Sequence, residues 1–178
     1  MLKEKYAQEI ESLLARYPED QSRSAILPLM HIAQQEYGYM SEDAMDEVAD
    51  ILGIDRTQVL SIAGFYTLYY EEPVGKYVLE VCNDLPCALR GADEFIEMAC
   101  QKLGVKKDEV TADGLFSVKN VMCLAACDKA PMLQCNLRYV ENLTEEKFDA
   151  LLEELRQEAA DREKKATVVD KILIDTHH

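Results

Sequence analysis

Two close pairs of cysteines constrain what this chain can fold into more than any other feature of its sequence. They are Cys82-x4-Cys87 and Cys123-x3-Cys127, and each pair begins where a predicted strand ends. Because α/β proteins place their sites in loops at strand ends, two such pairs at equivalent ends of neighbouring strands can converge. The fold is therefore expected to bring four thiols to one edge of a sheet.

Four thiols arranged as two pairs are compatible with several kinds of chemistry. They suit a [2Fe–2S] cluster, which takes one pair on each iron. They also suit a tetrahedral zinc site that staples a binding module, although such sites usually use x2 spacings and this sequence has none. Two disulfides and four inert buried thiols are the remaining interpretations. The spacing favours iron–sulfur over zinc and leaves the others open.

The other two cysteines, Cys100 and Cys135, fit better in a core than at a site. Cys100 lies on the apolar face of a predicted helix, four residues after Ile96, and Cys135 lies in a predicted strand. Cysteine is among the residue types most often buried. Both are therefore predicted to be core residues, although the strand of Cys135 follows the Cys127 loop and could bring it near the site.

The charge of the chain limits its partners. Its 178 residues include 19 basic and 34 acidic side chains, which give a formal net charge of −15. This balance argues against nucleic acid and anionic membranes, because both reward a basic face. The first residues carry Lys and Glu where a secretion signal would be apolar, and no stretch approaches the length of a membrane span. We expect a cytoplasmic protein without direct membrane insertion, in which paired cysteines indicate metal or redox chemistry.

The N-terminal part of the chain, residues 1–72, is predicted to form a helical bundle. Its apolar residues recur at intervals of three and four, which divides it into four short amphipathic helices. Ser22 or Ser24 is expected to begin the second helix, and Ser41 and Asp55 the third and fourth. Four aromatic residues at helical spacing are expected in the core, at the seam with the domain that follows: Phe65, Tyr66, Tyr69 and Tyr70.

From residue 73 the pattern changes to strands mixed with helices, and we predict an α+β or α/β domain over residues 73–165. Strands are expected at 77–81 and 116–121, a hairpin at 132–136 and 138–141, and helices at 89–103 and from Thr144 to about Arg162. Residues 166–178 are predicted to form a separate C-terminal tail. Gly-x-Gly occurs nowhere, so this chain alone is expected to bind neither NAD nor a flavin through a dinucleotide fold.

Specific short motifs run through both halves of the chain. They are Phe65-Tyr66-Thr67, Pro73-Val74-Gly75-Lys76-Tyr77, Val81-Cys82, Pro86-Cys87-x-Leu89-Arg90-Gly91, Asp113-Gly114-Leu115-Phe116, Cys123-Leu124-Ala125-Ala126-Cys127, Ala130-Pro131-Met132 and Tyr139-x-Glu141-Asn142-Leu143-Thr144. Together they make the sequence similar to the E subunits of NADH–quinone oxidoreductases, the respiratory complex I family. The similarity runs from about Ile26 to Leu152, which is most of the chain.

This resemblance implies a thioredoxin-like [2Fe–2S] ferredoxin domain after the helical bundle. It implies that Cys82, Cys87, Cys123 and Cys127 ligate the cluster, and that the cluster exchanges single electrons with FMN. The FMN, the NADH site and a [4Fe–4S] cluster are expected in a partner, the F subunit of the complex, with the G subunit as a further partner. The complex would lie peripherally on the inner membrane as part of the hydrophilic arm of complex I.

The resemblance leaves one alternative within the same class and shows a few departures. Similar modules occur in NAD-linked hydrogenases and formate dehydrogenases, and the sequence does not separate these from complex I. The family often has Gly at the position of Ala125, an aliphatic residue at Cys135, and Asp or Gly in the turn occupied by Leu137 and Arg138. None of these departures removes a predicted ligand.

Overall fold

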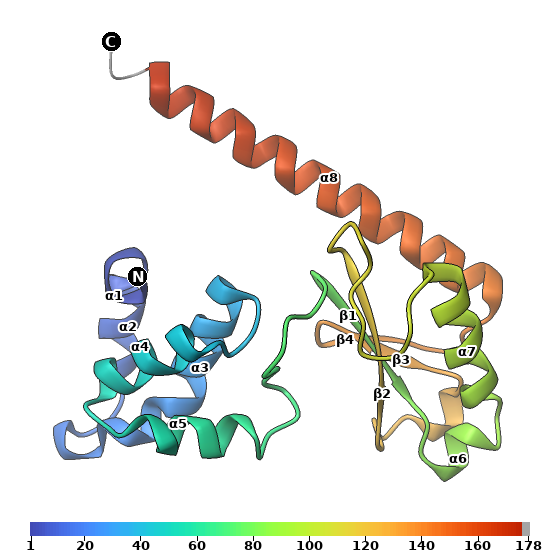
Figure 1. The fold of residues 1–178 in the computed structure, drawn as a ribbon, viewed down its shortest axis with the longest axis horizontal. Helices are drawn as coiled ribbons and strands as arrows, with labels where there is room; N and C mark the ends of the chain where they lie inside the picture. The colour runs from blue at the N-terminus through green and yellow to red at the C-terminus, as the bar shows by residue number, and fades with distance from the viewer. Residues whose placement is uncertain (176–178) are drawn as a thin grey trace. The chain divides into compact units, whose positions relative to one another are not determined.

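The structure is a computed structural model that describes the backbone of residues 1–175 and the side chains of residues 1–162 (Figure 1). The chain divides into two compact units between Val74 and Gly75. The first unit is helical, and the four strands described all belong to the second. The expected order, a helical part followed by a mixed domain of strands and helices, is confirmed.

The first unit consists of short helices, two of which begin at the predicted residues. They are α1 (Leu2–Lys5), α2 (Ala7–Leu14), the 3-10 segment η1 (Glu19–Ala25), α3 (Ile26–Tyr37), α4 (Glu42–Leu52) and α5 (Arg56–Ala63). The Ser41 hydroxyl accepts a hydrogen bond from the Ala44 N–H at 3.1 Å, and the Asp55 carboxylate accepts one from the Thr57 N–H at 2.8 Å. Both predicted N-caps are confirmed, because each side chain satisfies a backbone donor of the first turn.

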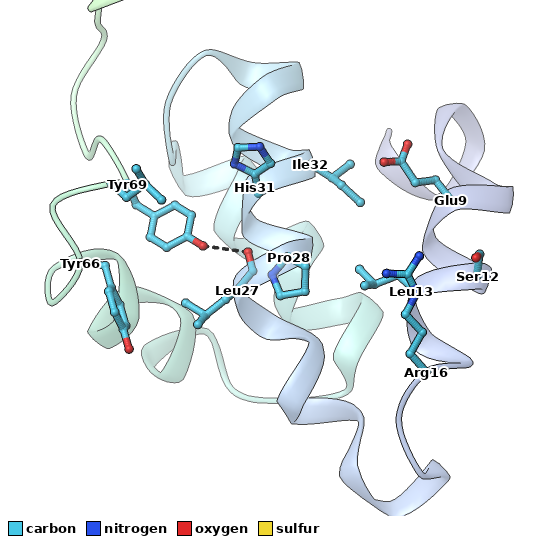
Figure 2. Close-up of a pocket in the computed structure, with 11 residues that line it drawn as sticks. Glu9, Ser12, Leu13, Arg16, Leu27, Pro28, His31, Ile32, Tyr66 and Tyr69 are labelled. Atoms are coloured by element: carbon cyan, nitrogen blue, oxygen red, sulfur yellow. Dashed lines mark hydrogen bonds between the residues drawn. The ribbon is translucent and has the colours of Figure 1, made fainter. Parts of the chain in front are cut away.

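Two predictions for the first unit are wrong. No serine caps α3, because the 3-10 segment η1 occupies that part of the chain and Ala25 directly precedes the helix. The aromatic stripe is not all core: Phe65 is 76% exposed and Tyr66 is 44% exposed. Helix α5 ends at Ala63, so helical spacing no longer places these side chains on one face. Tyr69 is buried, and its hydroxyl donates to the Leu27 carbonyl at 2.8 Å (Figure 2).

A groove of about 540 Å³ lies in this helical unit between α2, α3 and the segment that carries Tyr66 and Tyr69 (Figure 2). Its lining is mainly apolar, with Glu9, Arg16 and His31 among its titratable side chains. None of the six cysteines lines it. The groove therefore takes no part in the thiol chemistry of the chain.

The second unit is built on a four-stranded sheet in the order β2-β1-β3-β4. The strands are β1 (Tyr77–Cys82), β2 (Phe116–Val121), β3 (Leu133–Cys135) and β4 (Arg138–Val140). Strand β1 pairs in parallel with β2 and antiparallel with β3, and β3 pairs antiparallel with β4. Every residue of β1 is buried, so this central strand has both faces covered.

Four further helical segments complete the second unit. They are α6 (Leu85–Ala88), α7 (Ala92–Leu103), the 3-10 turn η2 (Cys127–Lys129) and α8 (Glu145–Asp175). The helix predicted over 89–103 begins only at Ala92, because Gly91 adopts a left-handed conformation (φ 89°) that separates it from α6. Helix α8 extends beyond the predicted end near Arg162. The side chains of the predicted tail, residues 166–178, lie outside the described part.

The core of the second unit lies between the sheet and the helices α7 and α8. The side chains of Tyr77, Leu79 and Val81, which alternate along β1, share it with Phe95 and Phe148. The two phenylalanine rings meet edge to face with their centroids 5.3 Å apart and join the two helices. No helix in the described part of the chain is both long and apolar enough to cross a membrane.

Gly75 allows the segment before β1 to lie directly against β2. A Cβ atom at this position would come within 2.4 Å of the carbonyl carbon of Phe116. The Gly75 N–H donates to the buried Ser117 hydroxyl at 2.8 Å. A residue with a side chain would push the two segments apart, which gives a steric reason for the glycine in the Pro73–Tyr77 motif.

Candidate metal centre

Both cysteine pairs lie at one edge of the sheet. Strands β1 and β2 run in parallel with Cys82 opposite Val121, and Cys123 follows two residues after Val121. The Asn83 N–H donates to the Val121 carbonyl at 3.1 Å and extends this pairing beyond the strand end. The predicted convergence of the two strand ends is confirmed, because parallel strands bring their carboxyl ends to the same edge.

The first pair is held in a rigid and largely dry environment. Cys82 is the last residue of β1 and Cys87 lies in α6, and both are buried. Asp84 is the N-cap that precedes α6, and its carboxylate accepts a hydrogen bond from the Leu85 N–H at 2.9 Å. The two cysteines form a small apolar cluster with three other buried residues: Ala92, Ala130 and Met132. The strand and the capped turn therefore fix both sulfur atoms.

The thiol of Cys87 is strongly biased towards its protonated form. Burial raises the pKa of Cys87 to about 12, and the neighbouring thiols of Cys82 and Cys127 act in the same direction. Cys87 therefore lies beside one cysteine from each predicted half of the site. In the metal-free chain it holds its proton at neutral pH, and a metal that binds there must displace that proton.

The second pair lies in a loop that is open to solvent. Cys123 is exposed and Cys127 is half-buried. The Ala125 N–H donates to the Cys123 sulfur at 3.4 Å, with Ala125 in the left-handed region at φ 58°. The Tyr139 hydroxyl donates to the Leu124 carbonyl at 2.8 Å and ties the loop to β4. Hydrogen bonds from N–H groups to sulfur stabilise the thiolate form that metals require.

The donor set fits a cluster with two irons. All six cysteines are free thiols, and Cys87 contacts one cysteine from each pair. In the described part of the chain, no three Cys, His, Asp or Glu side chains lie close enough together to hold a single metal ion. A [2Fe–2S] cluster divides four thiolates between two irons and needs only two on each. When bound, such a cluster supplies one-electron redox chemistry.

The remaining cysteines lie outside this cluster of residues. Cys135 is buried in the core between the sheet and α8, where it pairs with Leu79 of β1, and burial raises its pKa to about 11. This confirms the prediction that Cys135 is a core residue. Cys100 is half-buried and packs against the same core from α7. Neither belongs to the apolar cluster around Cys82 and Cys87.

The sequence did not single out two residues that connect the parts of the site, Arg90 and Tyr139. The Arg90 side chain reaches the loop after Cys127, where its Nε lies 3.2 Å from the Ala130 carbonyl and its Nη2 lies 3.4 Å from the Asp128 carbonyl. Both residues belong to the motifs that carry the family resemblance, and this was the only indication in the sequence that they matter for the site. Neither residue type marks a metal site by itself, so their roles became visible only with their partners.

Several large apolar side chains close to the cysteines in the sequence are exposed. Leu85 and Leu89 flank Cys87 and are 69% and 80% exposed, and Met122, next to Cys123, is 73% exposed. Exposed apolar side chains lose their contact with water when a partner protein covers them. The site is therefore bordered by side chains suited to a partner protein.

Known sequences resemble this chain over most of its length. The model of the thioredoxin-like [2Fe–2S] ferredoxin family matches residues 10–156. The E 2 subunit of NADH-quinone oxidoreductase from Rhizobium meliloti (strain 1021) is 43% identical over 155 residues, which cover 87% of this chain and 90% of that protein. NADH-quinone oxidoreductase subunit 2 of Thermus thermophilus is 43% identical over 83% of this chain and 82% of its own length. The resemblance inferred from the motifs is confirmed.

A solved structure shares the fold. An NAD⁺-reducing [NiFe]-hydrogenase in the air-oxidized state superposes with a TM-score of 0.63 and 20% sequence identity over 73% of this chain. This chain spans only 23% of that hydrogenase chain, so the likeness concerns the fold of one part of it. With the family match and the relatives above, it follows that the chain belongs to the thioredoxin-like [2Fe–2S] ferredoxin family.

Proposed function

We propose that this chain is the electron-transfer subunit of an NADH–quinone oxidoreductase and carries one [2Fe–2S] cluster on Cys82, Cys87, Cys123 and Cys127. The observation that carries the proposal is the convergence of two cysteine pairs at the carboxyl ends of β1 and β2. The family membership of the chain and the names of its relatives support it.

Different parts of the chain would hold the two pairs of cluster ligands. Strand β1 and the capped turn of α6 fix Cys82 and Cys87, while the Ala125 N–H supports the sulfur of Cys123. The apolar cluster beside the first pair excludes water from one side. A low-dielectric wall of this kind strengthens the electrostatic effects of nearby charges and N–H groups on the redox potential.

The electron must come from another chain, because the sequence contains no glycine-rich loop for a dinucleotide. We infer that the donor is FMN reduced by NADH in a flavoprotein partner, the F subunit of the complex, which would also hold a [4Fe–4S] cluster, with the G subunit as a further partner. The exposed Leu85, Leu89 and Met122 support a contact at the thiols. The assembled complex would lie on the cytoplasmic side of the inner membrane.

The cluster assignment is tested on the full-length chain, purified without oxygen. We expect about two irons and two sulfides per chain and an electron paramagnetic resonance signal that develops on one-electron reduction. A colourless protein that binds one zinc ion and gives no signal would instead support the zinc-stapled binding module.

The partner assignment is tested by co-purification with candidate flavoproteins. We expect the F subunit to co-purify and to allow NADH to reduce the cluster, which NADH alone should not do. Changing Leu85 and Leu89 together to Ser should weaken this association, whereas the control Leu137→Asn, at another exposed leucine, should not. Association only with the flavoprotein of a hydrogenase or formate dehydrogenase would assign the chain to that complex.

A further inference from the structure

We propose that Arg90 is a positioning residue for the cluster, which holds the loop after Cys127 against the turn of Cys87 and sets the redox potential through its charge. The inference deepens the proposed function and rests on it. Arg90 is not a ligand, and its effect is transmitted through the backbone of the loop and through the electrostatic field at the site.

Arg90 contacts both halves of the site with different atoms. Its backbone N–H donates to the Cys87 carbonyl at 3.0 Å, which closes the helical turn of the first pair. Its side chain crosses to the other half, where Nε donates to the Ala130 carbonyl at 3.2 Å and Nη2 donates to the Asp128 carbonyl at 3.4 Å. The planar guanidinium presents its donors in a fixed fork, so two contacts define the position of the loop better than one.

The segment after Cys127 is held from two sides. Its carbonyls at 128 and 130 accept hydrogen bonds from Arg90, while those of Lys129 and Pro131 accept from the N–H groups of Asn142 and Leu143 at 2.7 and 2.8 Å. Arg90 therefore supplies one of two rows of hydrogen bonds. Without it, the part-buried Ala130 carbonyl loses its side-chain donor and one side of the loop is released.

Arg90 forms no close ion pair with a carboxylate among the residues that the structure describes. The salt bridges found among the described residues include Lys129 paired with Asp128 at 3.6 Å, but none of them includes Arg90. The two carbonyls that it contacts are neutral, and a guanidinium stays protonated at every accessible pH. A positive charge beside the site favours the form of the cluster that carries the added electron.

The test compares Arg90→Gln and Arg90→Lys in the full-length chain with its reconstituted cluster. Arg90→Gln removes the positive charge. Arg90→Lys keeps the charge but loses the planar, forked arrangement of N–H donors. Lys106→Gln is the matched control, since it removes an equal charge at an exposed position beyond the far end of α7. That helix has 12 residues and spans about 18 Å, which places the control well away from the site.

Two measurements separate the two effects. In a redox titration, reduction of the Arg90→Gln cluster should become up to about tenfold less favourable, a downward shift of up to about 59 mV, while Arg90→Lys and the control stay near wild type. In the oxidised state both Arg90 variants should lose iron to a chelator several-fold faster than wild type and the control. Unchanged potential in Arg90→Gln overturns the electrostatic role, and unchanged iron loss in both variants overturns the positioning role.

The role of Arg90 is tested even if one or both variants take up no cluster. If Arg90→Lys assembles and Arg90→Gln does not, the charge is required and the proposal stands. If neither assembles, the thermal unfolding of the metal-free chain decides: unchanged unfolding supports a role specific to the site, and a lowered midpoint makes Arg90 merely structural and overturns the proposal. A wild-type chain that forms no cluster would contradict the proposed function instead.

Discussion

The two cysteine pairs carry the same thiol groups but differ in their burial and in the structure that holds them. Cys82 and Cys87 are buried at the end of a central strand and in a capped helical turn. Cys123 and Cys127 lie in a loop with an exposed sulfur and a residue in the left-handed conformation. One half of the site is fixed by the core of the fold, and the other is fixed by individual hydrogen bonds, among them those from Arg90, Ala125 and Tyr139.

The two pairs place different physical demands on the assembly of such a site. Cys87 of the buried pair costs free energy to ionise, because burial raises its pKa, but the pair needs no further ordering because the strand and the turn have already placed it. The second pair, with Cys123 exposed and Cys127 half-buried, must be held in position against the conformational freedom of a loop. We therefore expect substitutions in the first pair to affect the stability of the metal-free chain, and substitutions in the second pair to affect only what it binds.

The largest effect is expected from removing single thiols. Changing any one of the four to Ser should abolish or distort the cluster, because each removes a thiolate from a closed set of four. Cys87→Ser should also destabilise the metal-free chain by about 1–2 kcal/mol, because it buries a hydroxyl in an apolar site, whereas Cys123→Ser should not. Iron analysis and urea unfolding measure the two effects.

The controls for this series are Cys100→Ala and Cys135→Ala, which should keep about two irons per chain and lose only about 1 kcal/mol of packing. Normal iron content in Cys127→Ser would contradict the ligand assignment. Equal destabilisation by Cys87→Ser and Cys123→Ser would contradict the contrast between a buried and an exposed pair.

The order in which thiols react should reveal the same contrast in the metal-free chain. At pH 8 a thiol with a pKa of about 12 is ionised in about one molecule in ten thousand, so Cys87 should resist iodoacetamide. The exposed Cys123 should react first. Mass spectrometry of peptides from briefly treated protein gives the order, and modification of Cys87 before Cys123 would show that the buried turn opens readily.

The sequence predicted what depends on neighbouring residues and missed what depends on distant ones. Ser41 and Asp55 were identifiable as caps because each bonds a backbone donor two or three residues away. The strands that end at the cysteine pairs were identifiable from their alternation and their length. The link from Arg90 to the Ala130 carbonyl spans 40 residues, so no local pattern could indicate it.

Two errors have a local origin instead, because one residue ends or divides a helix that the apolar spacing continues. Phe65 and Tyr66 precede Tyr69 and Tyr70 by the four residues of a helical repeat. Helix α5 has already ended at Ala63, so this spacing does not define the face of a helix. The predicted helix at 89–103 absorbed part of the turn after α6, because only the left-handed conformation of Gly91 divides the two. The four paired cysteines could be selected as candidate ligands from their spacing in the sequence. Which of them would be buried depended on the packing of Ala130 and Met132, which come from a distant segment.

Cys135 is a buried thiol outside the two cysteine pairs, so it tests the effect of burial on a thiol pKa separately from the candidate site. Burial raises its pKa to about 11, while in the unfolded chain it titrates at about 8.5. Above that value the unfolded chain releases its proton first, so the free energy of unfolding should fall as pH rises from about 8.5 towards 11. Below about pH 8.5 the contribution is fully present.

Urea unfolding of the metal-free chain between pH 7 and 11, with and without Cys135→Ala, measures this contribution. The stability advantage of the wild type should shrink with rising pH and then change sign, because Ala has no proton to lose and the pKa shift is worth more than about 1 kcal/mol of packing. A difference that stays constant up to pH 11 would show that the Cys135 thiol ionises as readily in the folded chain as in the unfolded one.

The smallest effect concerns the backbone of the exposed loop. Ala125 holds φ at 58°, a region in which a Cβ atom costs roughly 1 kcal/mol and glycine is at no disadvantage. The greater freedom of glycine in the unfolded chain offsets part of this cost, so Ala125→Gly should stabilise the metal-free chain by at most a few tenths of a kcal/mol, roughly 0.5. The neighbouring Ala126→Gly is the control: its φ of −128° suits alanine, so it should only destabilise. A loss of stability in both variants would show that the left-handed conformation at Ala125 carries no strain, and that the loop is held by its hydrogen bonds alone.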